Sequence, residues 1–423
     1  MNRPPEIAFF PEASFGAALN CVGIAQALQR QGANPVFICH AGFTGVFAEY
    51  GFKEYHLPDH PGSSAEAIAD YWQYFINTHL PHFDLSPLAQ LGTYVGPTWR
   101  AIVETAIAAE DDLARLLAQI RPDAIVLDNV IMFPAIANAG CPWVRIVSCA
   151  ETEIPDAAVP PYLSGLAPGD DTAAFDAAYA DATRDVHRQY NAFRKRHGLP
   201  ALPPGIFLEP SEDLNLLLAP QAVRYERAEP LDPERFVFLE GCVRHESDYE
   251  LPRFAVEGGP LVYVGFGSLG AVDTDLIKRM LAVFQTIPAR FLVNVGGLIE
   301  AYDTVPDNVH LASWFPQPSV IEQAALVIHH GGNNTFCEAL YHGVPSLVMP
   351  YCWDGHDNAQ RAEGAGVGRS INRAEWSDAS LRAAIVDVLE DAPMRRRLAE
   401  VARDMQADPG TSRAAKGILA LLG

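Results

Sequence analysis

Short apolar runs alternate with longer amphipathic stretches along most of the chain. In the first part, Ile7–Phe10 and Ala124–Leu127 predict buried strands, and the periodicity of Ala18–Gln31 predicts a helix. A second alternating series starts with the strand pattern Leu261–Ser268 and continues with the helical stretch Leu276–Thr286. Strands that alternate with helices are typical of parallel sheets covered by helices. The pattern therefore predicts the α/β fold class.

The length of the chain and one polar segment divide this pattern into two domains. A chain of 423 residues, of which 49% are hydrophobic, is long enough to bury two cores. Residues 247–259 are polar and contain Pro and Gly, so they are predicted to form the interdomain linker. We expect an N-terminal Rossmann-like domain at residues 1–246, a C-terminal one at residues 260–405, and a final helix at residues 406–423.

Residues 60–98 are unusually rich in aromatic and His side chains, including Trp72, Phe75, His79 and Phe83. Such a stretch either lines an acceptor site or packs a helix into the core. Aromatic spacing alone rarely marks a ligand site, so packing in the core is the preferred interpretation.

One segment of the second half carries the most specific pattern. An apolar strand, Ala325–Ile328, leads through His330 and the turn Gly331-Gly332 into a short helix that ends at Gly343. Unpaired backbone N–H groups at the start of a helix and the positive pole of its dipole point to the same place. The arrangement predicts an anion site, to which the imidazole adds a side-chain donor.

The spacing within this segment resembles the donor-binding signature of the nucleotide-sugar-dependent glycosyltransferases, which include plant, macrolide and glucuronosyl enzymes. The matching positions are His330, Gly332, Asn334, Thr335, Glu338, Gly343-Val344-Pro345 and Asp354, with Trp314-Phe315-Pro316-Gln317 upstream. The resemblance implies the GT-B fold, in which two Rossmann-like domains face each other across a cleft and the last helix returns to the N-terminal domain. It also implies transfer of a sugar with inversion from a nucleotide-diphosphate sugar, with a UDP-sugar favoured.

The same resemblance implies a role for each part of the donor site. Trp314 would stack on the nucleobase, and Gln317 and Glu338 would hold the ribose. His330 and the helix start that follows it would hold the diphosphate, while Asp354 would hold the sugar hydroxyls. The predicted donor-binding residues are Ser268, Trp314, Phe315, Gln317, His330, Gly332, Asn333, Asn334, Thr335, Glu338 and Asp354.

Two positions depart from the family pattern. The sugar-contacting pair is Asp354-Gly355 where the family has Asp-Gln, so one sugar contact is missing or replaced. Near the N-terminus, Ala17 takes the place of the His that acts as the family's general base on the acceptor. Asp128, where the family has the Asp that orients this His, is either a vestige or the base itself, and it is the predicted catalytic residue. The other polar candidates, which sequence patterns do not rank, are Glu12, Ser14, Asn20 and His40.

Composition excludes several classes of partner. The formal net charge of −22 argues against binding to nucleic acid or an anionic membrane, because both need surfaces rich in Lys and Arg. No apolar run is long enough to span a bilayer, so we expect no integral membrane contact. The seven Cys residues are scattered, which is typical of reduced thiols in a cytoplasmic protein. The Asp273-Thr274-Asp275 triplet precedes a helical stretch, so it is interpreted as a helix cap and no metal is expected.

Together these patterns predict a cytoplasmic, bacterial hexosyltransferase of secondary metabolism that acts on a small lipophilic acceptor. Its co-substrate is the nucleotide sugar, and neither a cofactor nor a metal is expected. Without the usual His, the acceptor is a pre-activated nucleophile or another residue supplies the base. Two alternatives remain open: an enzyme that acts on the nucleotide sugar itself, and a non-catalytic accessory protein that binds the nucleotide sugar.

Overall fold

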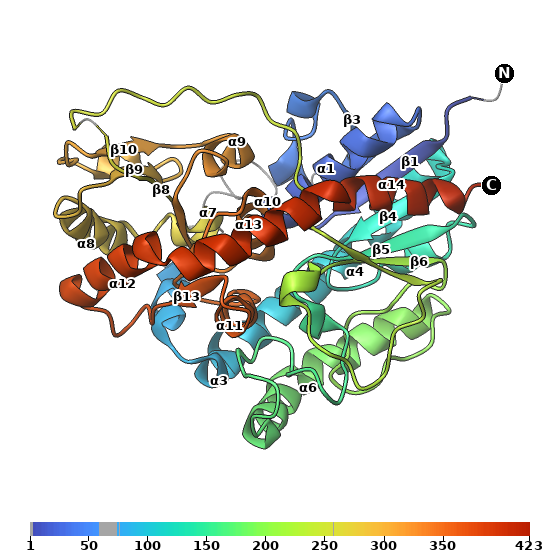
Figure 1. Cartoon of the computed structure of the whole chain (residues 1–423). Helices are drawn as coiled ribbons and strands as arrows, with labels where there is room; N and C mark the ends of the chain where they lie inside the picture. Colours follow the sequence, from blue (N-terminus) through green and yellow to red (C-terminus); the bar gives the residue numbers. More distant parts are fainter. Residues whose placement is uncertain (1–2, 59–73, 76, 257) are drawn as a thin grey trace.

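The computed structural model describes residues 3–58, 74–75, 77–256 and 258–423, and this part of the chain contains two parallel β-sheets (Figure 1). The first sheet has the strand order β3-β2-β1-β4-β5-β6-β7. Its strands are β1 (Glu6–Pro11), β2 (Asn34–Cys39), β3 (Lys53–His56), β4 (Ala124–Asp128), β5 (Trp143–Val147), β6 (Leu214–Leu218) and β7 (Phe236–Leu239).

The second sheet has the order β10-β9-β8-β11-β12-β13. Its strands are β8 (Leu261–Gly265), β9 (Arg290–Asn294), β10 (Val309–Ala312), β11 (Leu326–His329), β12 (Ser346–Val348) and β13 (Gly368–Ser370). In both sheets the order reverses beside the first strand, which is the topology of a Rossmann-like domain. The predicted fold class, α/β with two Rossmann-like domains, is therefore confirmed.

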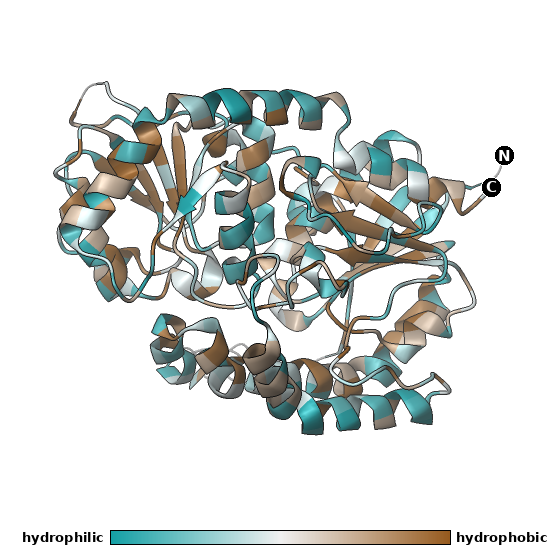
Figure 2. Ribbon diagram, turned by 60° about the horizontal axis from the view of Figure 1, so that its bottom comes forward, coloured by the Kyte–Doolittle hydropathy of each residue, from teal (hydrophilic) through white to brown (hydrophobic). Residues whose placement is uncertain are grey.

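Helices cover both faces of these sheets, and Figure 2 shows apolar strands enclosed by helices of mixed polarity. The α-helices are α1 (Phe15–Arg30), α3 (Pro87–Gln90), α4 (Gly96–Ile120), α5 (Pro134–Ala137), α6 (Ala173–Arg196), α7 (Gly267–Gly270), α8 (Thr274–Phe284), α9 (Gln317–Ile321), α10 (Asn333–His342), α11 (Gly355–Gly364), α12 (Asp378–Glu390), α13 (Ala392–Ala407) and α14 (Gly410–Ala420). None of the helices in the described residues combines the length and apolar character needed to cross a membrane.

Helix α1 begins three residues earlier than its apolar periodicity predicts. The hydroxyl oxygen of Ser14 accepts a hydrogen bond from the N–H of Ala17 at 3.4 Å, which caps the first turn. Because the cap precedes the apolar face, the periodicity of the sequence alone locates only the inner part of the helix.

The segment between the two sheets and the final helix connect the two halves of the molecule. After β7, the described residues between 240 and 260 form neither helix nor strand. Helix α14 then returns to the first domain (Figure 1), where Ala414, Ala415 and Ile418 are buried in the same cluster as Val22 of α1. The chain therefore crosses twice between the domains.

Part of the aromatic stretch at residues 60–98, including Trp72, lies outside the described residues. Phe83 is 3% exposed and its ring lies 4.7 Å from that of Tyr351 in the second domain. Tyr94 is equally buried and packs against Phe83 at 5.6 Å. These rings form core and interdomain contacts, as the preferred interpretation of this stretch expects.

Candidate functional site

The turn between β11 and α10 is built around two glycines. Gly331 has φ +93°, and a Cβ atom there would collide with the carbonyl oxygen of Gly355. A Cβ atom on Gly332 would lie 2.6 Å from Nε2 of His330. Only glycine allows the chain to turn this closely, so the turn brings the start of α10 against the start of α11.

The start of α10 presents unpaired donors. The backbone N–H groups of Gly332, Asn334 and Thr335 make no hydrogen bond to any residue in the described part of the chain. The helix has ten residues, so its dipole places partial positive charge at the same point. This end of α10 has the properties of an anion site.

His330 lies beside these donors. Its ring stacks on Tyr351 with 5.0 Å between the centroids, and its Nδ1 atom is buried without a hydrogen-bond partner among the described residues. Burial lowers the pKa of His330 to about 4, so the imidazole is neutral at physiological pH. It therefore offers a hydrogen bond rather than a charge.

Asp354 is the N-cap residue of α11 and also supports the start of α10. Its Oδ2 atom accepts a hydrogen bond from the N–H of Asn333 and another from Nδ2 of Asn358, both at 3.0 Å. Burial raises the pKa of Asp354 to about 7. One carboxylate oxygen is thus committed to the protein, and Oδ1 remains for a ligand hydroxyl.

Glu338 lies one turn further along α10 and is 1% exposed. Its Oε1 atom accepts hydrogen bonds from Nη1 of Arg244 at 2.7 Å and from Nδ2 of Asn334 at 3.3 Å. The Oε2 atom of Glu338 accepts a hydrogen bond from Nε2 of Gln317. The Oε1 atom of Gln317 in turn accepts a hydrogen bond from the hydroxyl of Tyr263. Burial raises the pKa of Glu338, and the Arg244 guanidinium opposes this effect.

The predicted ribose and base contacts are therefore close together. Gln317 also donates a hydrogen bond to the Thr335 hydroxyl at 3.1 Å. Trp314 is 49% exposed, and its ring lies 5.6 Å from that of Phe15 at the start of α1. Trp314 thus keeps one face available for stacking. Ser268 is exposed in the short helix α7, beside the same edge of the sheet.

Two of the predicted donor contacts have other tasks in the structure. Phe315 is 1% exposed and packs edge-on against Tyr263 at 5.8 Å, so its side chain lies in the core. The side-chain amide of Asn333 donates to the carbonyl oxygens of Ser148 and Leu218 at 2.8 and 2.9 Å. We correct Asn333 to an interdomain contact, because both of its amide hydrogens are used there.

Asp128, the predicted catalytic residue, ends β4 in the first domain. Its Oδ1 atom accepts a hydrogen bond from the Ser148 hydroxyl at 2.6 Å, and its Oδ2 atom accepts one from the Cys21 thiol at 3.9 Å. The residue is 2% exposed, and burial raises the pKa of Asp128 to about 8. Ala17 is 6% exposed within α1 and contributes no polar group.

Sequence reasoning missed the residues that join the two domains at this site. Arg244 lies in the irregular segment after β7, and Ser148 and Cys149 follow β5. The Cys149 carbonyl accepts a hydrogen bond from Nδ2 of Asn358 at 3.3 Å. No local pattern distinguishes these residues, because their partners lie about 100 to 200 positions away in the sequence.

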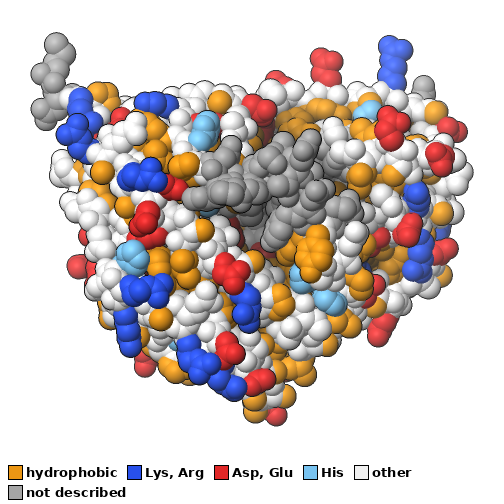
Figure 3. Space-filling view, turned by 180° about the vertical axis from the view of Figure 1, so that it is seen from behind, with side chains coloured by type: hydrophobic (Ala, Val, Ile, Leu, Met, Phe, Trp, Pro, Cys, Tyr) orange, Lys and Arg blue, Asp and Glu red, His pale blue; other side chains and the backbone are white. Residues whose placement is uncertain are grey.

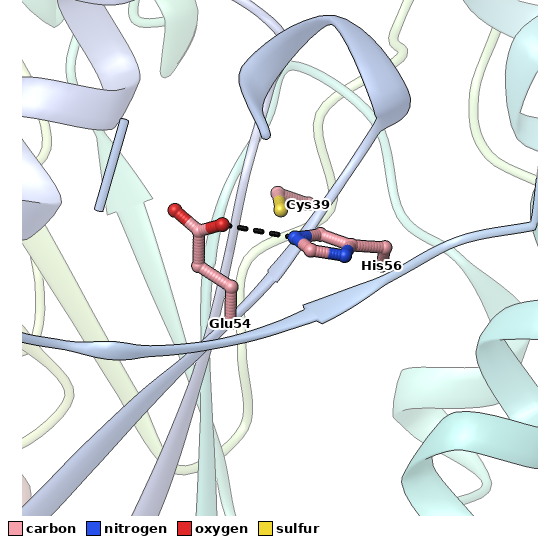
Figure 4. A group of neighbouring side chains, drawn as sticks. All are labelled: Cys39, Glu54 and His56. Carbon is pink, nitrogen blue, oxygen red and sulfur yellow. Dashed lines mark hydrogen bonds and ion pairs between the residues drawn. The ribbon is translucent and has the colours of Figure 1, made fainter. Parts of the chain in front are cut away.

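A second group of polar side chains lies at the end of β2 and β3, where ligand atoms of Cys39, Glu54 and His56 come within 4.8 Å of one another (Figure 4). Both oxygens of Glu54 accept backbone N–H groups, from Gly45 at 2.8 Å and from Phe47 at 2.8 Å. Burial raises the pKa of Cys39 to about 12, so its thiol is protonated. We interpret this group as structural, because the hydrogen bonds of Glu54 hold the loop between the two strands in place.

Part of the chain matches a known family, and named glycosyltransferases resemble it in sequence. Residues 285–421 match the family described as Erythromycin biosynthesis protein CIII-like, C-terminal domain. The NDP-glycosyltransferase YjiC of Bacillus subtilis is 26% identical over 56% of this chain and 61% of its own length. The oleandomycin glycosyltransferase of Streptomyces antibioticus is 25% identical over 79% of this chain and 76% of its own length. The match thus spans about three fifths of the Bacillus relative.

Solved structures share the whole architecture. The glycosyltransferase of kitacinnamycin superposes with a TM-score of 0.71 at 22% identity and covers 100% of both chains. The calicheamicin glycosyltransferase CalG4 superposes with a TM-score of 0.67 at 19% identity and covers 100% of this chain and 99% of its own. These likenesses identify the fold as GT-B. Residues 285–421 match the CIII-like family, and the chain as a whole resembles named glycosyltransferases in sequence.

Proposed function

We propose that this protein transfers a sugar, with inversion, from a nucleotide-diphosphate sugar to a small lipophilic acceptor. The observation that supports this best is the set of unpaired backbone N–H groups at Gly332, Asn334 and Thr335, next to the unpartnered Nδ1 of His330. The start of α10 would bind the diphosphate of the donor and stabilise it as it leaves.

The neighbouring groups fit the remaining parts of such a donor. Trp314 would stack on the base, and Gln317, which is hydrogen-bonded to Glu338, would lie at the nucleoside sugar. The free Oδ1 of Asp354 would accept from a hydroxyl of the transferred sugar. Uridine donors are tested first and thymidine donors second, because they differ at the methyl group near Trp314 and at the hydroxyl near Glu338.

The chemical requirements favour a single displacement. The leaving diphosphate is stabilised by neutral donors and a helix dipole, so we expect transfer without an added metal ion. No protein nucleophile is needed when the acceptor attacks the anomeric carbon directly, which inverts its configuration. Ala17 is the observation that favours the second candidate, a non-catalytic binder of nucleotide sugars, because it removes the usual base.

The test is nucleotide release from a panel of uridine- and thymidine-diphosphate sugars, with and without pooled phenol, carboxylate, amine and alcohol acceptors. We expect acceptor-dependent release from one donor, in the presence of EDTA as well as without it. His330→Ala should weaken binding of the free nucleoside diphosphate about tenfold, because it removes one buried hydrogen bond. Binding of nucleotide without release under any condition would favour the accessory protein.

A further inference from the structure

The proposed reaction leaves open which group takes the proton of the acceptor. The position that carries a His in the family is Ala17, which has no titratable group. Asp128 was the predicted substitute, but both of its oxygens already accept hydrogen bonds, from Ser148 and from Cys21. With 2% of its surface exposed, Asp128 has no free face toward an acceptor.

Glu12 is the carboxylate that remains. It directly follows β1, and its backbone is held on both sides: its N–H donates to the Asp128 carbonyl at 2.7 Å, and its own carbonyl accepts from Ser14 at 2.7 Å. Its side chain is partly exposed, and its carboxylate accepts no hydrogen bond from any described residue. The backbone is thus fixed while the carboxylate is free to accept a proton.

A short series of hydrogen bonds leads from Asp128, the neighbour of Glu12, to the donor site. Asp128 bonds to the Ser148 hydroxyl, and the Ser148 carbonyl accepts from the side-chain amide of Asn333 at the start of α10. The next carbonyl, that of Cys149, accepts from Asn358, which also bonds to Asp354. The turn after β5 is therefore hydrogen-bonded both to Asp128, whose backbone binds that of Glu12, and to the donor loops.

Among the described residues, Asp128 at the end of β4 and Cys149 after β5 interact electrostatically with Glu12. Burial raises the pKa of Glu12 to about 7 and that of Asp128 to about 8. The charge of Glu12 contributes to the raised pKa of Asp128, so ionisation of one carboxyl disfavours ionisation of the other. A general base works best when its pKa lies near the working pH.

We infer that Glu12 is the catalytic base that replaces the missing His. In the step it serves, the acceptor hydroxyl transfers its proton to a carboxylate oxygen of Glu12. The acceptor oxygen forms the bond to the anomeric carbon, and the bond from that carbon to the diphosphate breaks. The nucleoside diphosphate leaves with the electron pair. This inference rests on the proposed function.

The test compares acceptors of graded acidity in the full-length protein at pH 8. For aliphatic alcohols, Glu12→Gln should lower kcat/KM by about 10²–10⁴-fold, because the base is lost. For a nitrophenol that is already ionised at this pH, the loss should stay below about tenfold. In the unaltered protein, the rate with alcohols should fall as the pH drops below about 7, where Glu12 becomes protonated.

Two control variants separate chemistry from structure. Glu153→Gln removes another buried carboxylate whose pKa is raised, to about 8, and it should leave the dependence on acceptor acidity unchanged. Asp128→Asn tests the rival base, and its loss of kcat/KM with alcohols should be smaller than that of Glu12→Gln. Melting temperature and nucleotide affinity confirm that each variant is folded.

The outcomes are distinct. If Glu12→Gln loses activity equally with all acceptors, or loses none, Glu12 is not the base. Transfer by the unaltered protein would still support the proposed function in that case. A large loss for alcohols in Asp128→Asn, with Glu12→Gln active, assigns the base to Asp128 instead. No transfer by the unaltered protein with any acceptor overturns both proposals.

Discussion

The buried ion pair between Arg244 and Glu338 shows that a residue outside the signature positions a carboxylate of the candidate site. Both side chains are 1% exposed, and they come from different domains. Arg244 is also held by Glu246 and by the Tyr50 hydroxyl, and these partners raise its pKa further above the ordinary value. The carboxylate that is hydrogen-bonded to Gln317 is therefore positioned by a cation from the first domain.

Replacing Arg244 should expose this dependence. Arg244→Leu leaves Glu338 buried without its counter-ion, so we expect it to lower the free energy of unfolding by about 3–5 kcal/mol. The control is Arg184→Leu, which removes an exposed pair with Asp181 and should have little effect. Urea denaturation measures both. Equal, small changes in the two variants would show that the buried pair is not a significant contact.

At the scale of elements, the start of α10 depends on the close approach of α11. The turn at Gly331 and the carbonyl of Gly355 touch because neither position has a side chain. Asn358 of α11 donates a hydrogen bond to the Gly331 carbonyl at 2.8 Å and holds the turn in place. The geometry of the proposed anion site is therefore a property of the two helix starts together.

A methyl group at this turn should separate the two helices. We expect Gly331→Ala to weaken nucleoside-diphosphate binding by at least tenfold, because it combines a positive φ with a collision against Gly355. Gly297→Ala serves as the control, since a Cβ atom there meets nothing within 4 Å. Isothermal titration of both variants measures the effect. Unchanged affinity in Gly331→Ala would contradict the requirement for close approach.

At the scale of the whole molecule, α14 and the interdomain contacts hold the two domains in one arrangement. Helix α14 buries Ala415 against the first domain, although its sequence follows the second. Figure 3 shows acidic and basic side chains interspersed on one face of the molecule. The packing of α14 therefore links the stability of the domains.

A charge on the buried face of α14 should make the two domains unfold independently. Ala415→Glu places a carboxylate in an apolar cluster and should destabilise the protein by about 3 kcal/mol or more. Ala420→Glu introduces the same group at an exposed position of the same helix and should have little effect. Calorimetry of both variants measures this, and we expect two separate unfolding transitions only in Ala415→Glu. A single, unshifted transition there would disprove the coupling.

The buried carboxylates make stability depend on pH. Burial raises the pKa of Glu12, Asp128, Glu153 and Asp354 to about 7–8, whereas their ordinary values are 3.8 or 4.5. The folded state therefore binds more protons, and this contribution to stability is lost as the pH rises through the folded values. Buried His residues have pKa values lowered from 6.5. They make stability rise with pH, but only below about pH 6.5.

The free energy of unfolding should therefore fall between pH 6.5 and pH 8.5, a window set by those shifts. Urea denaturation at several pH values measures it, and Glu153→Gln should show a shallower decrease because that group no longer titrates. Stability that rises over this range would contradict the burial of these groups as carboxylic acids.

Local patterns predicted the parts of this molecule in which neighbours in sequence are neighbours in space. A strand at Ala325–Ile328, the glycine turn and a short helix after it are predicted locally, and the structure has them within two residues, as β11 and α10. Strand burial, turn geometry and helix capping act over a few residues. The contacts of Arg244 and Ser148 were not predictable, because each depends on the packing of one domain against the other. Phe315 was assigned to the donor for the same reason: its burial depends on Tyr263.

By itself, the sequence determined the α/β alternation, the two sheets and the residues that surround the start of α10. Only the tertiary structure decided which carboxylate is free. Asp128 ends one strand of the first sheet and Glu12 follows another. Asp128 is enclosed by Ser148 and Cys21, while the carboxylate of Glu12 has no hydrogen-bond partner among the described residues. The physical reason is that desolvation and hydrogen bonding depend on the groups that surround a side chain, and these come from distant parts of the chain.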